Sequence, residues 1–176
     1  MRNVSSEPAL DKKGAVDARV VRTCLVFREK AEEAVKFYVS LFKNSRIVEA
    51  VYSDGTMPIP KGQLVSAIFE LDGREYRAFD GGPSFSFSEG ISMDVVCDTQ
   101  EQIDQLWSRL TSEGGEEGPC GWCKDRFGVS WQIVPAALGE MMGDSKHGKP
   151  TQVMEALLKM KKLDIAALKA AYKGGS

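Results

Sequence analysis

Residues 20–42, VVRTCLVFREKAEEAVKFYVSLF, join an apolar, β-rich run to a segment whose apolar residues recur every three or four positions. The first part, residues 20–27, predicts a strand, and residues 30–42 predict a helix. Three more strands are predicted after it, at residues 47–52, 63–71 and 75–80. Asp72 and Gly73 separate the last two, and this dipeptide favours a hairpin. The predicted order is therefore βαβββ.

The same order begins again after a Gly-Gly-Pro linker. Residues 91–97 predict a strand, and residues 100–110 predict a helix with Asp98 or Thr99 as its N-cap. An acidic connection at 113–118 leads to a predicted hairpin of residues 121–125 and 129–134. We interpret residues 20–83 and 84–135 as two tandem βαβββ modules in an α+β fold, whose paired sheets form a curved surface with a concave face.

A shift of 69 residues superposes the two modules. It places Thr23 on Ser92 and Tyr38 on Trp107, and with a gap it places Arg77 on Gln132. Identity is low, so the repeat is one of pattern, and the alternative is that any two strand–helix units would align as well. The matching hairpin ends favour a true repeat.

The segments outside the modules are predicted to differ from them. Residues 1–19 are polar and charged and are expected to form a disordered leader. Residues 136–176 are expected to form a linker, flexible over 139–150, and a helical tail with helices at 152–160 and 165–172. The apolar stripe of the first tail helix is expected to dock on the domain or on a second subunit.

The composition excludes several classes of function. The chain has 23 basic and 25 acidic residues and a net charge of −2, so it has no global attraction for nucleic acid or an anionic membrane. It lacks an 18-residue apolar run and an apolar signal-peptide core, so we expect a cytoplasmic protein. His147 is its single histidine, which excludes any site that needs two.

Cysteine usage fits that compartment. Cys24 and Cys97 lie inside predicted strands, where a reduced thiol acts as a small apolar group. Cys120 and Cys123 form a CxxC motif, which in other contexts serves redox or zinc chemistry. Here the motif precedes a strand and has no second CxxC or nearby histidine, so incidental cysteines are the favoured interpretation.

Several stretches together resemble a known family. They are AEEAVKFYVSLFKNSRI (31–47), FELDG (69–73), FDGGPSFSFSEGIS (79–92), CDTQEQIDQLWSRL (97–110), GGEEGPCGWCKDRFGVSWQIVP (114–135) and LLKMKKLDIAALKAAY (157–172). The chain resembles the PhnB-like branch of the vicinal oxygen chelate superfamily, which includes glyoxalase I, bleomycin-resistance proteins and extradiol dioxygenases. This branch is often labelled a 3-demethylubiquinone-9 3-methyltransferase domain. The resemblance implies a curved, glyoxalase-like sheet and a homodimer.

The resemblance also implies where a metal would be bound. In the metal-dependent members, four positions on the concave face supply His, Gln or Glu ligands, and they map to Thr23, Arg77 (or Ala78), Ser92 and Gln132. Most of these side chains are poor ligands for a divalent transition metal, and the charge of Arg77 would oppose one. We therefore expect no metal and no cofactor. The methyltransferase label finds no support, because no glycine-rich loop follows a strand as a nucleotide cofactor would require.

The same face is predicted to bind a ligand of another kind. Thr23, Arg77, Ser92 and Gln132 would form a polar cluster in which the arginine suits a carboxylate or phosphonate. Trp131 and Trp122, with Phe85 and Phe87, would form its walls, unless these aromatic side chains belong to the core and Arg77 faces solvent. The predicted function is metal-free binding of a small organic molecule, with no catalytic residue identified. An enzyme of the same superfamily (a lyase, isomerase or dioxygenase-like activity) and a dimeric interaction module that uses the tail remain alternatives.

Overall fold

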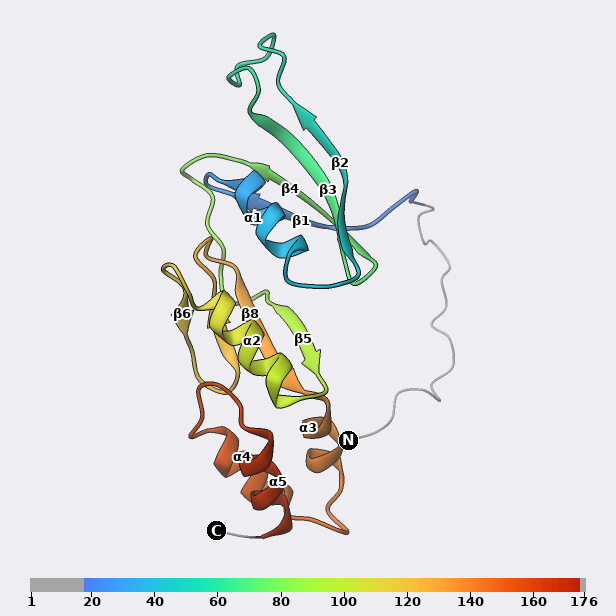
Figure 1. Ribbon diagram of the computed structural model, residues 1–176, viewed down its shortest axis with the longest axis vertical. Coiled ribbons are helices and arrows are strands. Elements are labelled where there is room, and N and C mark those ends of the chain that lie inside the picture. Colours follow the sequence, from blue (N-terminus) through green and yellow to red (C-terminus); the bar gives the residue numbers. More distant parts are fainter. Residues whose placement is uncertain (1–17, 175–176) are drawn as a thin grey trace.

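The first module is a four-stranded sheet covered on one face by a helix. In the computed structural model, which describes residues 18–174, its elements are β1 (Thr23–Phe27), α1 (Ala31–Val39), β2 (Ser45–Tyr52), β3 (Leu64–Leu71) and β4 (Arg74–Asp80). The strand order is β1-β4-β3-β2, with β1 parallel to β4 and the other pairs antiparallel (Figure 1). Most of the predicted leader, residues 1–17, lies outside the described residues.

The second module repeats this topology. Its elements are β5 (Met93–Cys97), α2 (Gln100–Leu110), β6 (Glu116–Glu117), β7 (Trp122–Lys124) and β8 (Ser130–Pro135). The order is β5-β8-β7-β6, and β5 is again parallel to β8. The predicted α+β fold of two βαβββ units is confirmed. The prediction missed β6, because a strand of two glutamates within a glycine-rich connection has no apolar alternation.

The structural register refines the sequence repeat. The parallel register pairs Cys24 with Arg77 in the first module and Asp94 with Gln132 in the second, so Arg77 and Gln132 are equivalent, as predicted. Strands β1 and β5 are offset by 70 residues, however, whereas the helix starts are offset by 69. The extra residue lies in the connection before α1, where Lys30 adopts a left-handed conformation with φ of 71°.

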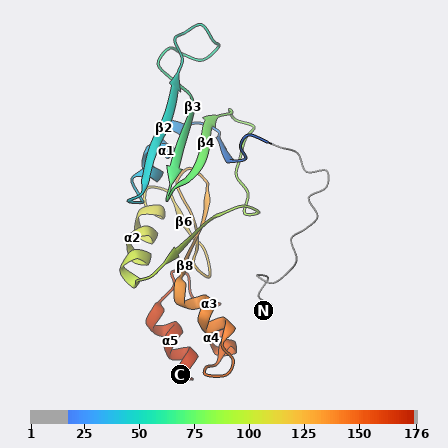
Figure 2. The ribbon, with the colours of Figure 1, turned by 90° about the vertical axis from the view of Figure 1, so that its right-hand side faces the viewer.

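Helices α1 and α2 lie on the same side of the molecule, and the sheets of their two modules lie on the other side (Figure 2). Arg109 at the end of α2 donates hydrogen bonds to the carbonyl and the hydroxyl of Ser40 at the end of α1. Side chains from both modules form one hydrophobic core in this helix layer, with Phe27, Tyr38 and Trp131 among its largest members. The modules therefore fold as one body.

Asp125 is the polar centre of that core. Its carboxylate accepts hydrogen bonds from the Tyr38 hydroxyl (2.8 Å), the Trp131 indole (2.8 Å) and the backbone N–H groups of Phe127 (2.9 Å) and Val129 (3.0 Å). Burial raises the pKa of this carboxyl, and the four donors act in the opposite direction. Because Tyr38 comes from α1 and Asp125 from the β7–β8 turn, this network joins the two modules.

A three-helix tail follows the second module. It consists of α3 (Ala136–Gly143), α4 (Pro150–Leu157) and α5 (Ile165–Lys173), which bury Met141, Val153, Leu163 and Leu168 in a small core of their own. The prediction of a flexible stretch from residue 139 is wrong for residues 139–143, which are helical.

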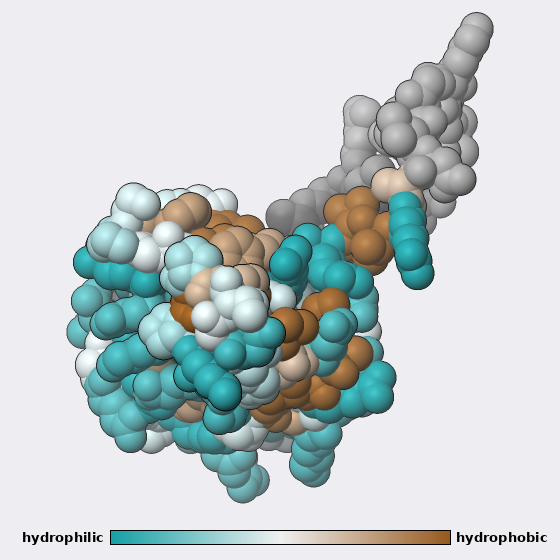
Figure 3. Space-filling model, turned by 90° about the horizontal axis from the view of Figure 1, so that it is seen from above, coloured by the Kyte–Doolittle hydropathy of each residue, from teal (hydrophilic) through white to brown (hydrophobic). Residues whose placement is uncertain are grey.

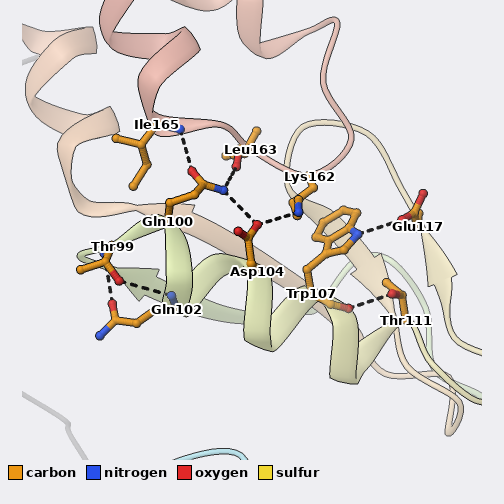
Figure 4. A network of polar contacts seen from close by, with 10 residues as sticks. All are labelled: Thr99, Gln100, Gln102, Asp104, Trp107, Thr111, Glu117, Lys162, Leu163 and Ile165. Carbon is orange, nitrogen blue, oxygen red and sulfur yellow. Dashed lines mark hydrogen bonds and ion pairs between the residues drawn. The ribbon is translucent and has the colours of Figure 1, made fainter.

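The tail docks on the second module through polar contacts (Figure 4). The Gln100 side chain donates to the carbonyl of Leu163 (3.0 Å) and accepts from the N–H of Ile165 (2.9 Å). Lys162 pairs with Asp104 at 2.6 Å. The backbone N–H groups of Cys120 and Gly121 each donate to tail carbonyls at 2.7 Å. Docking on the domain, one of the two predicted possibilities for the tail, is therefore observed.

None of the helices within residues 18–174 is long and apolar enough to cross a membrane.

Candidate functional site

Each sheet has one face that is not covered by a helix, and together we call these the open face. Strand alternation sends Leu25, Phe27 and Ala78 into the core, so Cys24 and Arg77 point to the open face. In the second module Trp131 and Ile133 are buried, so Gln132 between them points to the open face.

Three of the predicted site residues meet on the second sheet. The Gln132 side-chain amide donates to the Ser92 hydroxyl at 2.7 Å. Trp122 is the cross-strand neighbour of Gln132 and is half-buried on the same face. The result is a small polar pair beside an indole ring, which can offer a ligand hydrogen bonds and a flat apolar wall.

Arg77 is an exposed residue of the first sheet and lines a cavity of about 170 Å³. The cavity is lined by Arg22, Glu49, Ser66, Ile68 and Arg77. The Arg77 guanidinium lies 5.6 Å from the centre of the Phe79 ring, and no ion pair to Arg77 occurs within residues 18–174. A guanidinium without a counter-ion at the wall of a cavity is a ready partner for an anionic group.

The other predicted residues are placed differently. Thr23 shares the helix-facing side of β1 with Leu25 and Phe27, so Cys24 occupies the position expected for it. Trp131 is 1% exposed and donates to Asp125, so it belongs to the core. Phe87 packs against Phe27 at 5.1 Å between ring centres.

The remaining aromatic candidate, Phe85, is 43% exposed. A Cβ on Gly81 would collide with Phe85 and with Val26, so Phe85 lies close to the open face. A signal for Cys24 was present in the sequence, since Leu25 and Phe27 are the larger apolar residues of β1 and mark its buried side.

The open face does not fit a divalent metal. Its central positions in register are Cys24 opposite Arg77 and Asp94 opposite Gln132, a set that includes a fixed positive charge. Among the residues that the structure describes, no group of three His, Cys, Asp or Glu side chains could hold an ion.

The CxxC motif does not have the features of a reactive thiol pair. Cys120 and Cys123 are free, and Cys123 is 4% exposed. Burial raises the pKa of the Cys123 thiol to about 12, which keeps it protonated and unreactive.

A larger cavity of about 390 Å³ lies at the start of α1. Its charged groups other than Lys30 already have partners. Lys36 pairs with Glu32 at 2.6 Å, Glu33 pairs with Arg126 at 3.1 Å, and Asp80 accepts the first N–H of α1 from Ala31 at 2.8 Å. This cavity is therefore a weaker candidate than the one beside Arg77.

Comparison with known proteins agrees with this architecture. Residues 19–134 match the family described as 3-demethylubiquinone-9 3-methyltransferase. The PhnB protein of Bacillus cereus, which carries the same description, is 35% identical, with a TM-score of 0.60 over 66% of this chain and 98% of its own. No curated protein sequence matches the chain.

More distant structures share the fold. Protein PA1353 of Pseudomonas aeruginosa is 23% identical, with a TM-score of 0.53 over 65% of this chain and 96% of its own. The fosfomycin resistance protein FosX of Listeria monocytogenes, in complex with Mn(II) and sulfate, is 15% identical, with a TM-score of 0.52 over 72% of this chain and 99% of its own. The βαβββ topology, the open face and the match over residues 19–134 lead to one conclusion: the chain belongs to the PhnB-like family described as 3-demethylubiquinone-9 3-methyltransferase.

Proposed function

We propose that this protein binds a small organic anion on the open face, without a metal ion. The observation that carries the proposal is the cavity beside Arg77, whose guanidinium has no counter-ion among residues 18–174 and which Ser66 and Ile68 also line. The Ser92–Gln132 pair and Trp122 on the second sheet would add hydrogen-bonding groups and an apolar wall. Thr23 and Trp131 play no direct part in this proposal, because they lie on the other side of their sheets.

The size of the cavity limits the ligand. Pockets for drug-sized molecules have volumes of about 300–1,000 Å³, so the 170 Å³ here suits a smaller molecule. A planar guanidinium binds carboxylate and phosphonate groups through two parallel hydrogen bonds, which makes these the anionic groups of choice.

A thermal-shift screen with small carboxylates and phosphonates tests the proposal. A ligand that binds only the folded state raises stability by about 2.7 kcal/mol at a hundred times its dissociation constant. Arg77→Met should abolish the shift, whereas Arg74→Met, on the same strand but outside the cavity, should preserve it. A shift that survives Arg77→Met would contradict the proposal.

Methyl transfer, which the family description names, lacks support in these residues. A nucleotide-type methyl donor is typically bound where a parallel strand leads into a helix through a glycine-rich turn. The two such turns here, Arg28–Lys30 and Asp98–Thr99, contain no glycine and belong to small mixed sheets. We therefore infer no transfer step.

We also propose that the protein is a homodimer of the cytoplasm. Strands β1 and β5 are edges of their sheets, and exposed apolar residues lie on or beside them: Val20, Val21, Ile91 and Val96. Figure 3, a view from above, shows hydrophobic patches near the beginning of the described chain on an otherwise largely hydrophilic surface. Exposed apolar edge strands tend to be covered in native proteins, and a second copy would cover these. The four free cysteines agree with a reducing compartment.

Sedimentation equilibrium tests the dimer. Val21→Lys combined with Val96→Lys should yield a folded monomer, because it places charge at both edges. Leu158→Lys, at an exposed position of the tail, should leave the dimer intact. The reverse pattern would identify the tail as the interface instead.

A further inference from the structure

The open face of the first sheet is organised in rows that run across the strands. One row consists of Arg22, Glu75, Glu70 and Arg46, on β4, β3 and β2 and the residue before β1. Its four charges neutralise one another, because Arg22 pairs with Glu75 at 2.9 Å and Arg46 pairs with Glu70 at 2.8 Å. This row is satisfied without a ligand.

The adjacent row is different. It consists of Cys24, Arg77, Ile68 and Glu49, in consecutive register across β1, β4, β3 and β2. Arg77 and Glu49 flank Ile68, so their backbones are about two strand spacings, roughly 10 Å, apart. Within residues 18–174, neither Arg77 nor Glu49 forms an ion pair.

These residues share one cavity. Arg77, Ile68 and Glu49 all line the 170 Å³ space, together with Arg22 and Ser66. The guanidinium of Arg22 pairs with Glu75. Among residues 18–174, the cavity therefore holds two opposite charges without counter-ions, those of Arg77 and Glu49.

The opposite charges of Arg77 and Glu49 indicate which class of ligand fits the cavity. A simple anion at Arg77 would share the cavity with the Glu49 carboxylate, whose like charge opposes it. A simple cation at Glu49 would meet the corresponding repulsion from Arg77. A molecule with an anionic group at one end and an ammonium group at the other satisfies both ends, and an apolar spacer between them would lie over Ile68.

We propose that this half of the open face binds a short zwitterion, an amino acid whose amino and acid groups are separated by a few methylene groups. Its anionic group is bound by Arg77, and its ammonium group is bound by Glu49. The inference rests on the proposed function, since it specifies the ligand of the same cavity.

Matched probes test it by calorimetry on the full-length protein. The zwitterions are 3-aminopropanoate, 4-aminobutanoate, 5-aminopentanoate and 6-aminohexanoate, and each is compared with the carboxylate that lacks the amino group. We expect at least one zwitterion to bind about tenfold more tightly than its matched carboxylate. Glu49→Gln should remove this preference without weakening the carboxylate, and Arg77→Met should abolish binding of both.

Glu70→Gln, in the neutralised row, is the matched control and should leave the preference unchanged. If every zwitterion binds no better than its carboxylate, or if Glu49→Gln preserves the preference, the zwitterion proposal fails while the proposed anion site stands. If neither these probes nor the wider panel of small carboxylates and phosphonates binds the wild-type protein, both proposals fail.

Discussion

Asp125 is a buried carboxylate on which side chains from both modules converge. A buried charge is tolerated only where hydrogen bonds replace the water it has lost, and Asp125 accepts four. The sequence shows an aspartate before a Phe-Gly turn, which predicts a turn residue and nothing more. Its partner Tyr38 lies 87 positions away in the chain, so no local pattern could identify this network.

Removing one donor from this network should destabilise the protein. Tyr38→Phe leaves the buried Asp125 with one hydrogen bond fewer, and we expect a loss of about 1–3 kcal/mol in the free energy of unfolding. Urea denaturation measures it. Tyr52→Phe is the control, because its hydroxyl bonds the exposed Glu32 and its loss should cost under about 0.5 kcal/mol. Equal effects of the two changes would contradict the role given to Asp125.

Because two thiols are buried, we expect the free energy of unfolding to be smaller in alkaline solution. Burial raises the pKa of Cys97 to about 11 and that of Cys123 to about 12, compared with about 8.5 in an unfolded chain. At pH values between the unfolded pKa and the native pKa of each thiol, the unfolded chain binds fewer protons than the native protein. The free energy of unfolding therefore falls as the pH rises through this range.

Denaturation under reducing conditions at pH 8 and pH 10 tests this dependence. The free energy of unfolding should be smaller at pH 10. Cys123→Ala should reduce the difference between the two values, and Cys24→Ala, at an exposed thiol, should not. An unchanged pH dependence in Cys123→Ala would refute the assignment.

At the scale of elements, local signals predicted most of the fold and missed what packing decides. Helix α2 has the predicted bounds, because Thr99 and Gln102 form a capping box at its start. Helix α3 was missed because its sequence, AALGEMMG, has two glycines and no clear amphipathic pattern, and its burial of Met141 depends on α4 and α5. The repeat offset placed Thr23 on the wrong face of β1, because no alignment of strands and helices by one shift could detect the extra residue at Lys30.

That extra residue leads to a prediction. Lys30 has a positive φ, which costs a residue with a Cβ atom about 1–2 kcal/mol and costs glycine nothing. After the higher entropy of unfolded glycine is subtracted, Lys30→Gly should stabilise the protein by about 0.5–1 kcal/mol. Thermal unfolding measures it. Lys36→Gly, inside α1, should destabilise by about 1 kcal/mol. Destabilisation by both changes would mean that Lys30 contributes contacts that outweigh its strain.

At the scale of the whole molecule, the tail lies outside the part of the chain that matches the family. The family match ends at residue 134, before α3 begins. The sequence could predict tail helices from their apolar spacing. It could not choose between the domain and a second subunit, because the choice depends on Gln100, whose side chain bonds residues more than sixty positions away.

Weakening that attachment should loosen the tail selectively. Gln100→Ala removes the bonds to Leu163 and Ile165, and we expect faster amide hydrogen exchange across residues 136–174 with no change across residues 23–80. Gln105→Ala, which loses only a contact with Glu101 on the same helix, is the control. Uniform acceleration across both regions would show that the tail and the modules unfold together.

The parallel pairing of β1 with β4 also has a consequence for synthesis on the ribosome. Arg22 and Glu75, which are joined at the start of this pairing, are 53 positions apart in the chain. At about 5–20 residues per second, β1 leaves the ribosome roughly 3–10 s before its partner strand exists. During that interval the apolar segment TCLVF has no strand to pair with. Strand β1 is the first strand of its sheet to be synthesised but can pair only after β4 has been made. Until then, β1 is the segment of the nascent chain that is most exposed to aggregation.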